Sequence, residues 1–175
     1  MKYDYLLKKC DLCRRHCGVN RLNGELGICT ANDNLIVARA ELHLWEEPPI
    51  SCENGSGTVF FSHCNLKCVF CQNHEISQEY KGAEITINRL SDIFLELQNK
   101  GANNINLVTP THYVPQIIEA IEIAKYKGLK LPILYNTNGY DTLETIKLLD
   151  GYIDVYLPDF KYFDDKYSIK YSKAK

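Results

Sequence analysis

The 175-residue sequence lacks the features that direct a chain into or across a membrane. Residues 1–7 do not form the apolar core of a signal peptide, and no apolar run approaches the roughly 20 residues that span a bilayer. Basic residues are not in excess: the net charge is −2, so electrostatics give no reason to expect nucleic acid or an anionic membrane as a partner. We therefore expect a cytoplasmic protein that binds neither nucleic acid nor a membrane.

Signals for disulfide bonds are missing as well, although the chain has eight cysteines. Without an export signal, so many thiols favour metal ligation over disulfide pairing. The apolar fraction of 45% and the charged fraction of 24% are ordinary for a globular protein. A chain of 175 residues suffices for one domain with a small appendage.

Three cysteines lie close together at C-x3-C-x2-C spacing: Cys64, Cys68 and Cys71. They follow residues 58–61, an apolar run that predicts a buried strand. Three thiolates in one short loop can hold three irons of a cubane [4Fe–4S] cluster, and no cysteine follows Cys71 to bind the fourth iron. That iron would stay open for a small molecule. The alternatives are a zinc site completed from elsewhere, or cysteines packed as small apolar side chains.

A second set of cysteines precedes this loop: Cys10, Cys13, Cys17 and Cys29. The glycines between them permit the tight turns by which four thiolates converge on one ion. A site with four thiolates is closed, which indicates a structural metal. The spacing does not separate zinc from a second iron–sulfur cluster, and His16 could replace one of the thiolates.

Strands and helices alternate in the rest of the chain. Strands are expected at 58–62, 104–109, 131–136 and 153–157, and helices at 86–100, at 115–128 and from Asp141 to before Gly151, with Asp141 and Glu144 as a capping box. Another helix is expected to start at residue 165. Successive βα units at short spacing predict an α/β fold with a parallel sheet and right-handed crossovers.

A boundary is expected near residue 50. Residues 35–40 predict one more strand, and the prolines at 48–49 then break regular structure. We expect a Cys-rich metal-binding module over residues 1–50 and a core domain over residues 51–175.

Polar residues stand where the four expected strands of the core end. In parallel α/β barrels the active site forms at the carboxyl ends of the strands. The residues expected on this rim are His63, Cys64, Thr109, Thr111, Asn136, Thr137, Asn138, Asp159 and Lys161.

The loop from Cys64 to Cys71, with Phe70 before its last cysteine, resembles the radical S-adenosylmethionine (SAM) signature C-x3-C-x-aromatic-C. Residues 56–73, and the order Cys-x-Leu-Cys-x-Arg-x-Cys-Gly from Cys10 onward, are similar to the subgroup named after pyruvate formate-lyase-activating enzyme. The resemblance implies a partial parallel (β/α) TIM-like barrel of the radical SAM type, with about four βα units present.

The resemblance also implies the chemistry. Cys64, Cys68 and Cys71 would hold a [4Fe–4S] cluster, and SAM would chelate its open iron. An electron from a donor such as flavodoxin or ferredoxin would cleave SAM to methionine and a 5′-deoxyadenosyl radical, which abstracts a hydrogen atom. The chain would then be an oxidoreductase of the activating-enzyme type, and a protein glycyl site or a small molecule would be its substrate.

Residues near SAM are carried over from the same resemblance. Phe70 would lie by the adenine. Thr109 stands where the family usually has a Gly-Gly-Glu-Pro-like element, so the glutamate is absent here. Asn136 begins an Asn-Thr-Asn-Gly match to the family's Asp-Thr-Asn-Gly element, and Asp159 and Lys161 match its Asp-Leu-Lys element.

Family cores resemble a barrel of six βα units, and this sequence supplies four expected strands and the start of one more helix. We therefore expect a chain that is truncated at its C-terminus, or a partner chain that completes the barrel. One rival reading is an inactive scaffold with two structural metal sites. Another is a zinc-ribbon nucleic-acid binder, against which the acidic net charge argues.

Overall fold

The computed structural model describes residues 2–175. Its strands are β1 (Leu35–His43), β2 (Ser56–Phe61), β3 (Ala83–Ile85), β4 (Ile105–Val108), β5 (Ile133–Thr137) and β6 (Val155–Pro158). Its helices are α1 (Tyr5–Lys8), α2 (Pro48–Ser51), α3 (His74–Ser77), α4 (Ile87–Asn99), α5 (Val114–Tyr126), α6 (Leu143–Leu148) and α7 (Asp165–Ser172), with 3-10 turns η1 (Arg21–Asn23) and η2 (Thr111–Tyr113).

The strands form one open sheet in the order β3-β1-β2-β4-β5-β6. Strands β2, β4, β5 and β6 are parallel, as the βα pattern predicted. Strands β1 and β3 are antiparallel to their neighbours. The predicted partial barrel is therefore confirmed, and it carries an antiparallel extension that the sequence did not predict.

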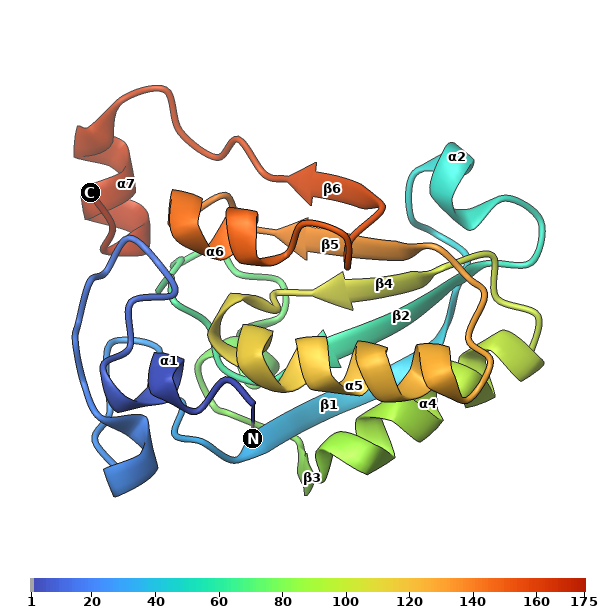
Figure 1. Cartoon of the computed structure of the whole chain (residues 1–175). Helices are drawn as coiled ribbons and strands as arrows, with labels where there is room; N and C mark the ends of the chain where they lie inside the picture. The colour runs from blue at the N-terminus through green and yellow to red at the C-terminus, as the bar shows by residue number, and fades with distance from the viewer. Residues whose placement is uncertain (1) are drawn as a thin grey trace.

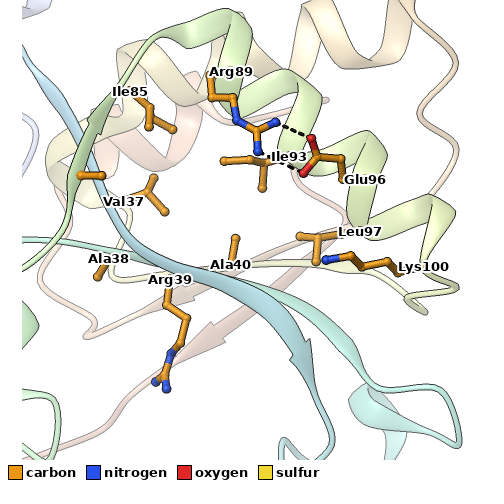
Figure 2. Close-up of a pocket in the computed structure, with 11 residues that line it drawn as sticks. Val37, Ala38, Arg39, Ala40, Ile85, Arg89, Ile93, Glu96, Leu97 and Lys100 are labelled. Carbon is orange, nitrogen blue, oxygen red and sulfur yellow. Dashed lines mark hydrogen bonds and ion pairs between the residues drawn. The ribbon is translucent and has the colours of Figure 1, made fainter.

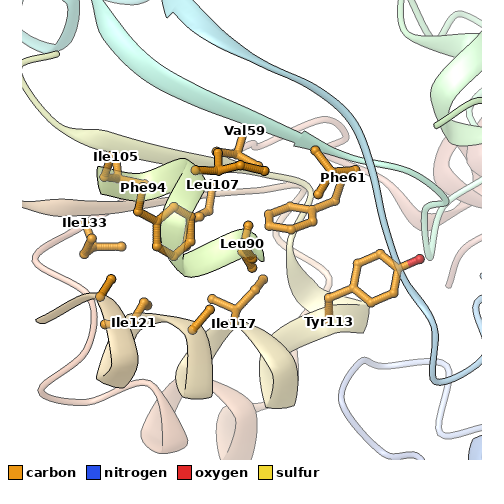
Figure 3. Close-up of a cluster of buried hydrophobic side chains, with 14 of the residues drawn as sticks. Val59, Phe61, Leu90, Phe94, Ile105, Leu107, Tyr113, Ile117, Ile121 and Ile133 are labelled. Atoms are coloured by element: carbon orange, nitrogen blue, oxygen red, sulfur yellow. The ribbon is translucent and has the colours of Figure 1, made fainter. Parts of the chain in front are cut away.

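The main core lies between the sheet and the helices α4 and α5 (Figure 3). In β2, Val59 and Phe61 face these helices, and Leu107 does so from β4. They pack against Phe94 of α4 and Ile117 of α5, which are fully buried. Each such side chain contributes about 1.5–3 kcal/mol by leaving water, so this layer fixes the helices against the parallel strands.

Helix α4 begins where the sequence predicted. Thr86 is its N-cap, and the Thr86 side chain accepts a hydrogen bond from the backbone N–H of Arg89 at 3.1 Å. The third predicted helix was placed wrongly at its start: α6 is capped by Thr142 rather than Asp141. The Asp141 carboxylate instead accepts a hydrogen bond from the Tyr135 hydroxyl at 2.8 Å.

The segment that precedes the expected boundary packs on the rest of the chain. Strand β1 lies before residue 50 and is nevertheless part of the sheet. The two prolines expected to break regular structure instead open the single-turn helix α2. Tyr3, Cys10 and Leu12 are buried in a second cluster with Val114 and Tyr135. The division at residue 50 stays a prediction.

A groove of about 250 Å³ lies between β1, β3 and α4 (Figure 2). Val37, Ala40 and Ile93 contribute apolar side chains to it, and the ion pair of Arg89 with Glu96 borders it. No cysteine and no residue of the predicted rim lines this groove. It is therefore separate from the site described next.

Candidate functional site: two thiol clusters at the rim of the sheet

The carboxyl ends of the parallel strands meet at one edge, as predicted. The pairing of Val108 with Asn136, and of Thr137 with Pro158, aligns the ends of β4, β5 and β6. Figure 1 shows these strands pointing toward the end of the molecule where α7 and the N-terminal segment lie, with α2 at the opposite end. Side chains from the loops after β2, β5 and β6 can therefore meet on this rim.

The loop after β2 carries the first three cysteines. Cys68 is buried, and Cys64 and Cys71 are partly buried. All three pack in one small cluster with Leu66 and Ala174. The predicted trio of thiols is thus brought together, and residues next to the end of α7 cover it.

Each sulfur of this trio has a polar partner. The partners are Asn138 Nδ2 for Cys64 Sγ (3.4 Å), Ser172 Oγ for Cys68 Sγ (2.8 Å) and Ser77 Oγ for Cys71 Sγ (3.3 Å). Burial, reinforced by the neighbouring thiols, raises the pKa of Cys64 to about 11. A metal that binds here must displace the thiol protons, so its affinity will rise with pH.

The N-terminal cysteines form a second cluster of thiols. Cys17 Sγ lies 3.9 Å from the backbone oxygen of Cys10, and the pKa values of Cys13 and Cys17 both respond to Cys10 and Cys29. Burial raises the pKa of Cys13 to about 11, and burial raises the pKa of Cys17 as well. Gly27 belongs to the same site because a Cβ atom there would stand 2.7 Å from Cys17 Sγ. Only glycine leaves room for that sulfur.

The N-terminal segment is fastened directly to the loop that carries the first trio. Arg15 Nε donates to the backbone oxygen of Asn65 at 2.9 Å, and Arg15 also donates to the backbone oxygen of Lys173. The backbone N–H of Arg14 donates to the backbone oxygen of Tyr140, in the loop after β5, at 3.1 Å. The two thiol clusters are therefore neighbours.

A cavity of about 520 Å³ opens on the same rim. Asp159 and Lys161, both predicted, line it and form an ion pair. Arg14 and His16 of the N-terminal segment line it as well. Phe70 is 58% exposed and makes an edge-on contact with Tyr162, another lining residue, with ring centroids 6.2 Å apart.

Two predicted residues lie away from the sulfurs. The Asn136 amide donates to Glu46 Oε2 at 3.3 Å, together with the Asn106 amide at 3.0 Å. Thr109 follows β4 and has a φ of 56°, which β-branched residues rarely adopt. The backbone N–H of Thr109 donates to the backbone oxygen of Asn136 at 2.9 Å. Their roles near SAM stay predictions.

The residues that contact the sulfurs of the loop were not predicted to do so from the sequence. Asn138 was expected on the rim but not beside Cys64, and Ser77 and Ser172 were not singled out. Asn138 lies in the strand-end run Asn-Thr-Asn-Gly, which offered a signal. Ser172 reaches Cys68 only through the packing of α7, for which the sequence gives no local signal.

The comparisons with known proteins bear on the core. The family model of the radical SAM superfamily matches residues 58–174. The chain belongs to the radical SAM superfamily. It is also 34% identical over 178 residues to an uncharacterized protein of Methanocaldococcus jannaschii, an alignment that covers 97% of this chain and 50% of that protein. The chain thus spans about half the length of that relative.

The radical SAM assignment implies a [4Fe–4S] cluster, and the donor set fits one. The loop offers thiols alone, the ligands such clusters prefer. The loop also holds a buried amide donor, Asn65 Nδ2, that has no hydrogen-bond partner among residues 2–175. Among residues 2–175 no three His, Cys, Asp or Glu side chains stand in metal-holding geometry.

No helix within residues 2–175 of this radical SAM chain is both long and apolar enough to cross a membrane.

Proposed function

We propose that this chain binds a [4Fe–4S] cluster through Cys64, Cys68 and Cys71 and takes part in the reductive cleavage of SAM. The observation that carries the proposal is the clustering of these three thiols at the carboxyl ends of parallel strands in a radical SAM protein. When bound, the cluster supplies the electron that splits SAM into methionine and a 5′-deoxyadenosyl radical.

The protein's own contribution begins with the sulfurs. The Asn138 amide and the Ser172 hydroxyl donate hydrogen bonds to Cys64 and Cys68. Such bonds favour thiolate over thiol and tune the reduction potential of a bound cluster. Burial of Cys68 keeps bulk water away from its sulfur.

The rim cavity is the proposed SAM site. Its volume of about 520 Å³ lies within the range of small-molecule pockets. Lys161 offers a positive charge for the SAM carboxylate, and Asp159 offers a negative charge for its amino group. The exposed ring of Phe70 provides an apolar surface for the adenine. Thr109 and Asn136 complete the proposed set on the neighbouring strand ends.

The remaining assignments belong to the same proposal, and all but the cytoplasmic location draw on the resemblance. They are an activating-enzyme-like subtype, a flavodoxin or ferredoxin as electron donor, and a cytoplasmic location. A protein substrate and a further segment or chain that completes the barrel also belong to it.

A single-turnover assay tests the proposed function. The chain is reconstituted anaerobically with iron and sulfide, reduced with a low-potential reductant and mixed with SAM. We expect methionine and 5′-deoxyadenosine in equal amounts, with neither formed by Cys68→Ala. The matched control is Cys52→Ala, because Cys52 is exposed and lies outside both thiol clusters. A fully loaded chain that binds SAM without cleaving it would instead support a scaffold.

A further inference from the structure

Arg21 is a buried cation that has no acidic partner among residues 2–175. It is 0% exposed, and its guanidinium donates only to backbone oxygens, that of His112 at 2.5 Å and that of Asn32 at 3.0 Å. No carboxylate in the described part of the chain lies within ion-pair distance of it. A buried charge is costly unless an opposite charge compensates it.

Arg21 and the N-terminal thiol Cys29 share a neighbour, Tyr113. Arg21 and Cys29 both act electrostatically on the Tyr113 hydroxyl, and the Arg21 guanidinium is 6.0 Å from the Tyr113 ring. As neutral thiols the cysteines offer Arg21 no compensation. Four thiolates around a divalent ion, or around a [4Fe–4S]²⁺ core, carry a net charge of −2.

Asn65 lies between the N-terminal thiols and the thiols of the Cys64–Cys71 loop. It is 0% exposed, and its Nδ2 has no hydrogen-bond partner within the described chain. Arg15, two residues after Cys13, donates through Nε to the Asn65 backbone oxygen at 2.9 Å, and the Asn65 side chain lowers the pKa of Cys13 against the larger rise caused by burial. On its other side, Asn65 Oδ1 accepts from Asn138 Nδ2 at 2.6 Å, and the same nitrogen is 3.4 Å from Cys64 Sγ.

We propose that Cys10, Cys13, Cys17 and Cys29 bind a thiophilic metal as an anionic tetrathiolate centre, and that Asn65 couples this centre to the Cys64 loop. Asn65 is a positioning residue: it donates to the Cys13 sulfur and holds Asn138 against the Cys64 sulfur. The centre supplies the counter-charge for Arg21. Only the coupling to a loop cluster rests on the proposed function; metal binding by the N-terminal thiols does not.

Cobalt(II) titration tests metal binding by the N-terminal thiols in a chain whose loop cannot bind metal. The full chain carries Cys64→Ala, Cys68→Ala and Cys71→Ala, so the loop has no thiols. We expect one cobalt per chain, with sulfur charge-transfer and tetrahedral d–d absorption. Adding Cys29→Ser should abolish this spectrum, and adding Cys52→Ser should preserve it. Absence of the spectrum from a chain that circular dichroism shows to be folded would overturn the proposal.

Native mass spectrometry of the otherwise unaltered chain covers the case in which the triple variant does not fold. Cys29→Ser should then lose one metal centre that Cys52→Ser retains, and retention of both centres in Cys29→Ser would overturn the proposal. The mass identifies the metal as zinc or as iron with sulfide. Either result supports a tetrathiolate centre.

Asn65→Leu tests the coupling residue. In the triple-alanine background it should weaken cobalt binding about 10- to 100-fold, as loss of a partner beyond the ligands does elsewhere. Asn99→Leu, at the exposed end of α4, is the matched control and should bind as the parent does. Unchanged affinity in Asn65→Leu would refute its role.

A second readout uses the chain with its loop cysteines intact. Loss of the N-terminal centre in Cys29→Ser should shift the midpoint potential of the loop cluster, and Cys52→Ser should not. Equal potentials in the two variants would refute the coupling even if the tetrathiolate centre exists.

Discussion

Replacement of Arg21 by methionine should destabilise the metal-loaded chain more than the metal-free chain. In both forms the variant leaves the backbone oxygens of Asn32 and His112 without their charged donor. Only in the loaded form does it also leave the proposed tetrathiolate centre without its counter-charge. The difference between the two forms isolates that electrostatic contribution.

The expected magnitudes follow from these contacts. Leaving two carbonyls unsatisfied, offset by removal of a buried cation, should lower the free energy of unfolding of the metal-free chain by about 1–3 kcal/mol. Breaking a compensated buried charge pair should lower that of the loaded chain by about 3–5 kcal/mol. For a chain of this size the larger loss corresponds to a fall in melting temperature of about 10 °C.

Thermal and denaturant unfolding followed by circular dichroism measures both quantities. Arg39→Met is the matched control because Arg39 is exposed, where it pairs with Glu41 at 3.2 Å and lies over the Phe60 ring. Its cost should stay below about 1 kcal/mol in either form. An Arg21→Met penalty that is the same with and without metal would refute the assignment of the counter-charge.

Three further predictions concern single positions. Thr86→Ala removes the N-cap of α4 and should lower the free energy of unfolding by about 1 kcal/mol, whereas Thr86→Ser keeps a capping hydroxyl and should lose little stability. Equal stability of these two variants and the unaltered chain would contradict the role of Thr86 as a cap. Gly27→Ala should weaken metal binding at the N-terminal thiols, because its Cβ would collide with Cys17 Sγ. Gly151→Ala is the control for backbone strain alone, since Gly151 has a φ of 78° but its Cβ would meet open space; equal cobalt affinities of the two variants would contradict the prediction. Burial lowers the pKa of His112 to about 3 in the folded chain. As pH drops from about 6.5 toward 3, His112 is protonated in the unfolded chain but not in the folded chain, so the free energy of unfolding should fall. His112→Gln should flatten this part of the pH profile of stability, and an unaltered slope would contradict the prediction.

The parallel part of the fold could be predicted because its signals are local. Apolar periodicity in α4 and α5 and the Thr86 cap are written in neighbouring residues, and βα alternation then constrains the topology. The pairing of β1 with β2 and β3 is different. It joins segments through contacts that no local pattern encodes, so the antiparallel extension was missed.

The candidate site was predictable to the extent that it follows strand ends and cysteine spacing. The thiol trio, Asp159 and Lys161 lie on the predicted rim for that reason. The Asp141 cap was wrong because Tyr135 and Thr137 compete for its carboxylate. The contacts of Asn65 depend on how two distant loops pack, which composition and periodicity do not describe.

Electron paramagnetic resonance of the anaerobically reconstituted and reduced chain, with and without SAM, tests the central claim most directly. We predict a cubane cluster signal that shifts when SAM is added and that disappears in Cys68→Ala, because SAM binds the iron that the three loop cysteines leave open. A cluster signal indifferent to saturating SAM, or a loop that takes up only zinc, would contradict the proposed function.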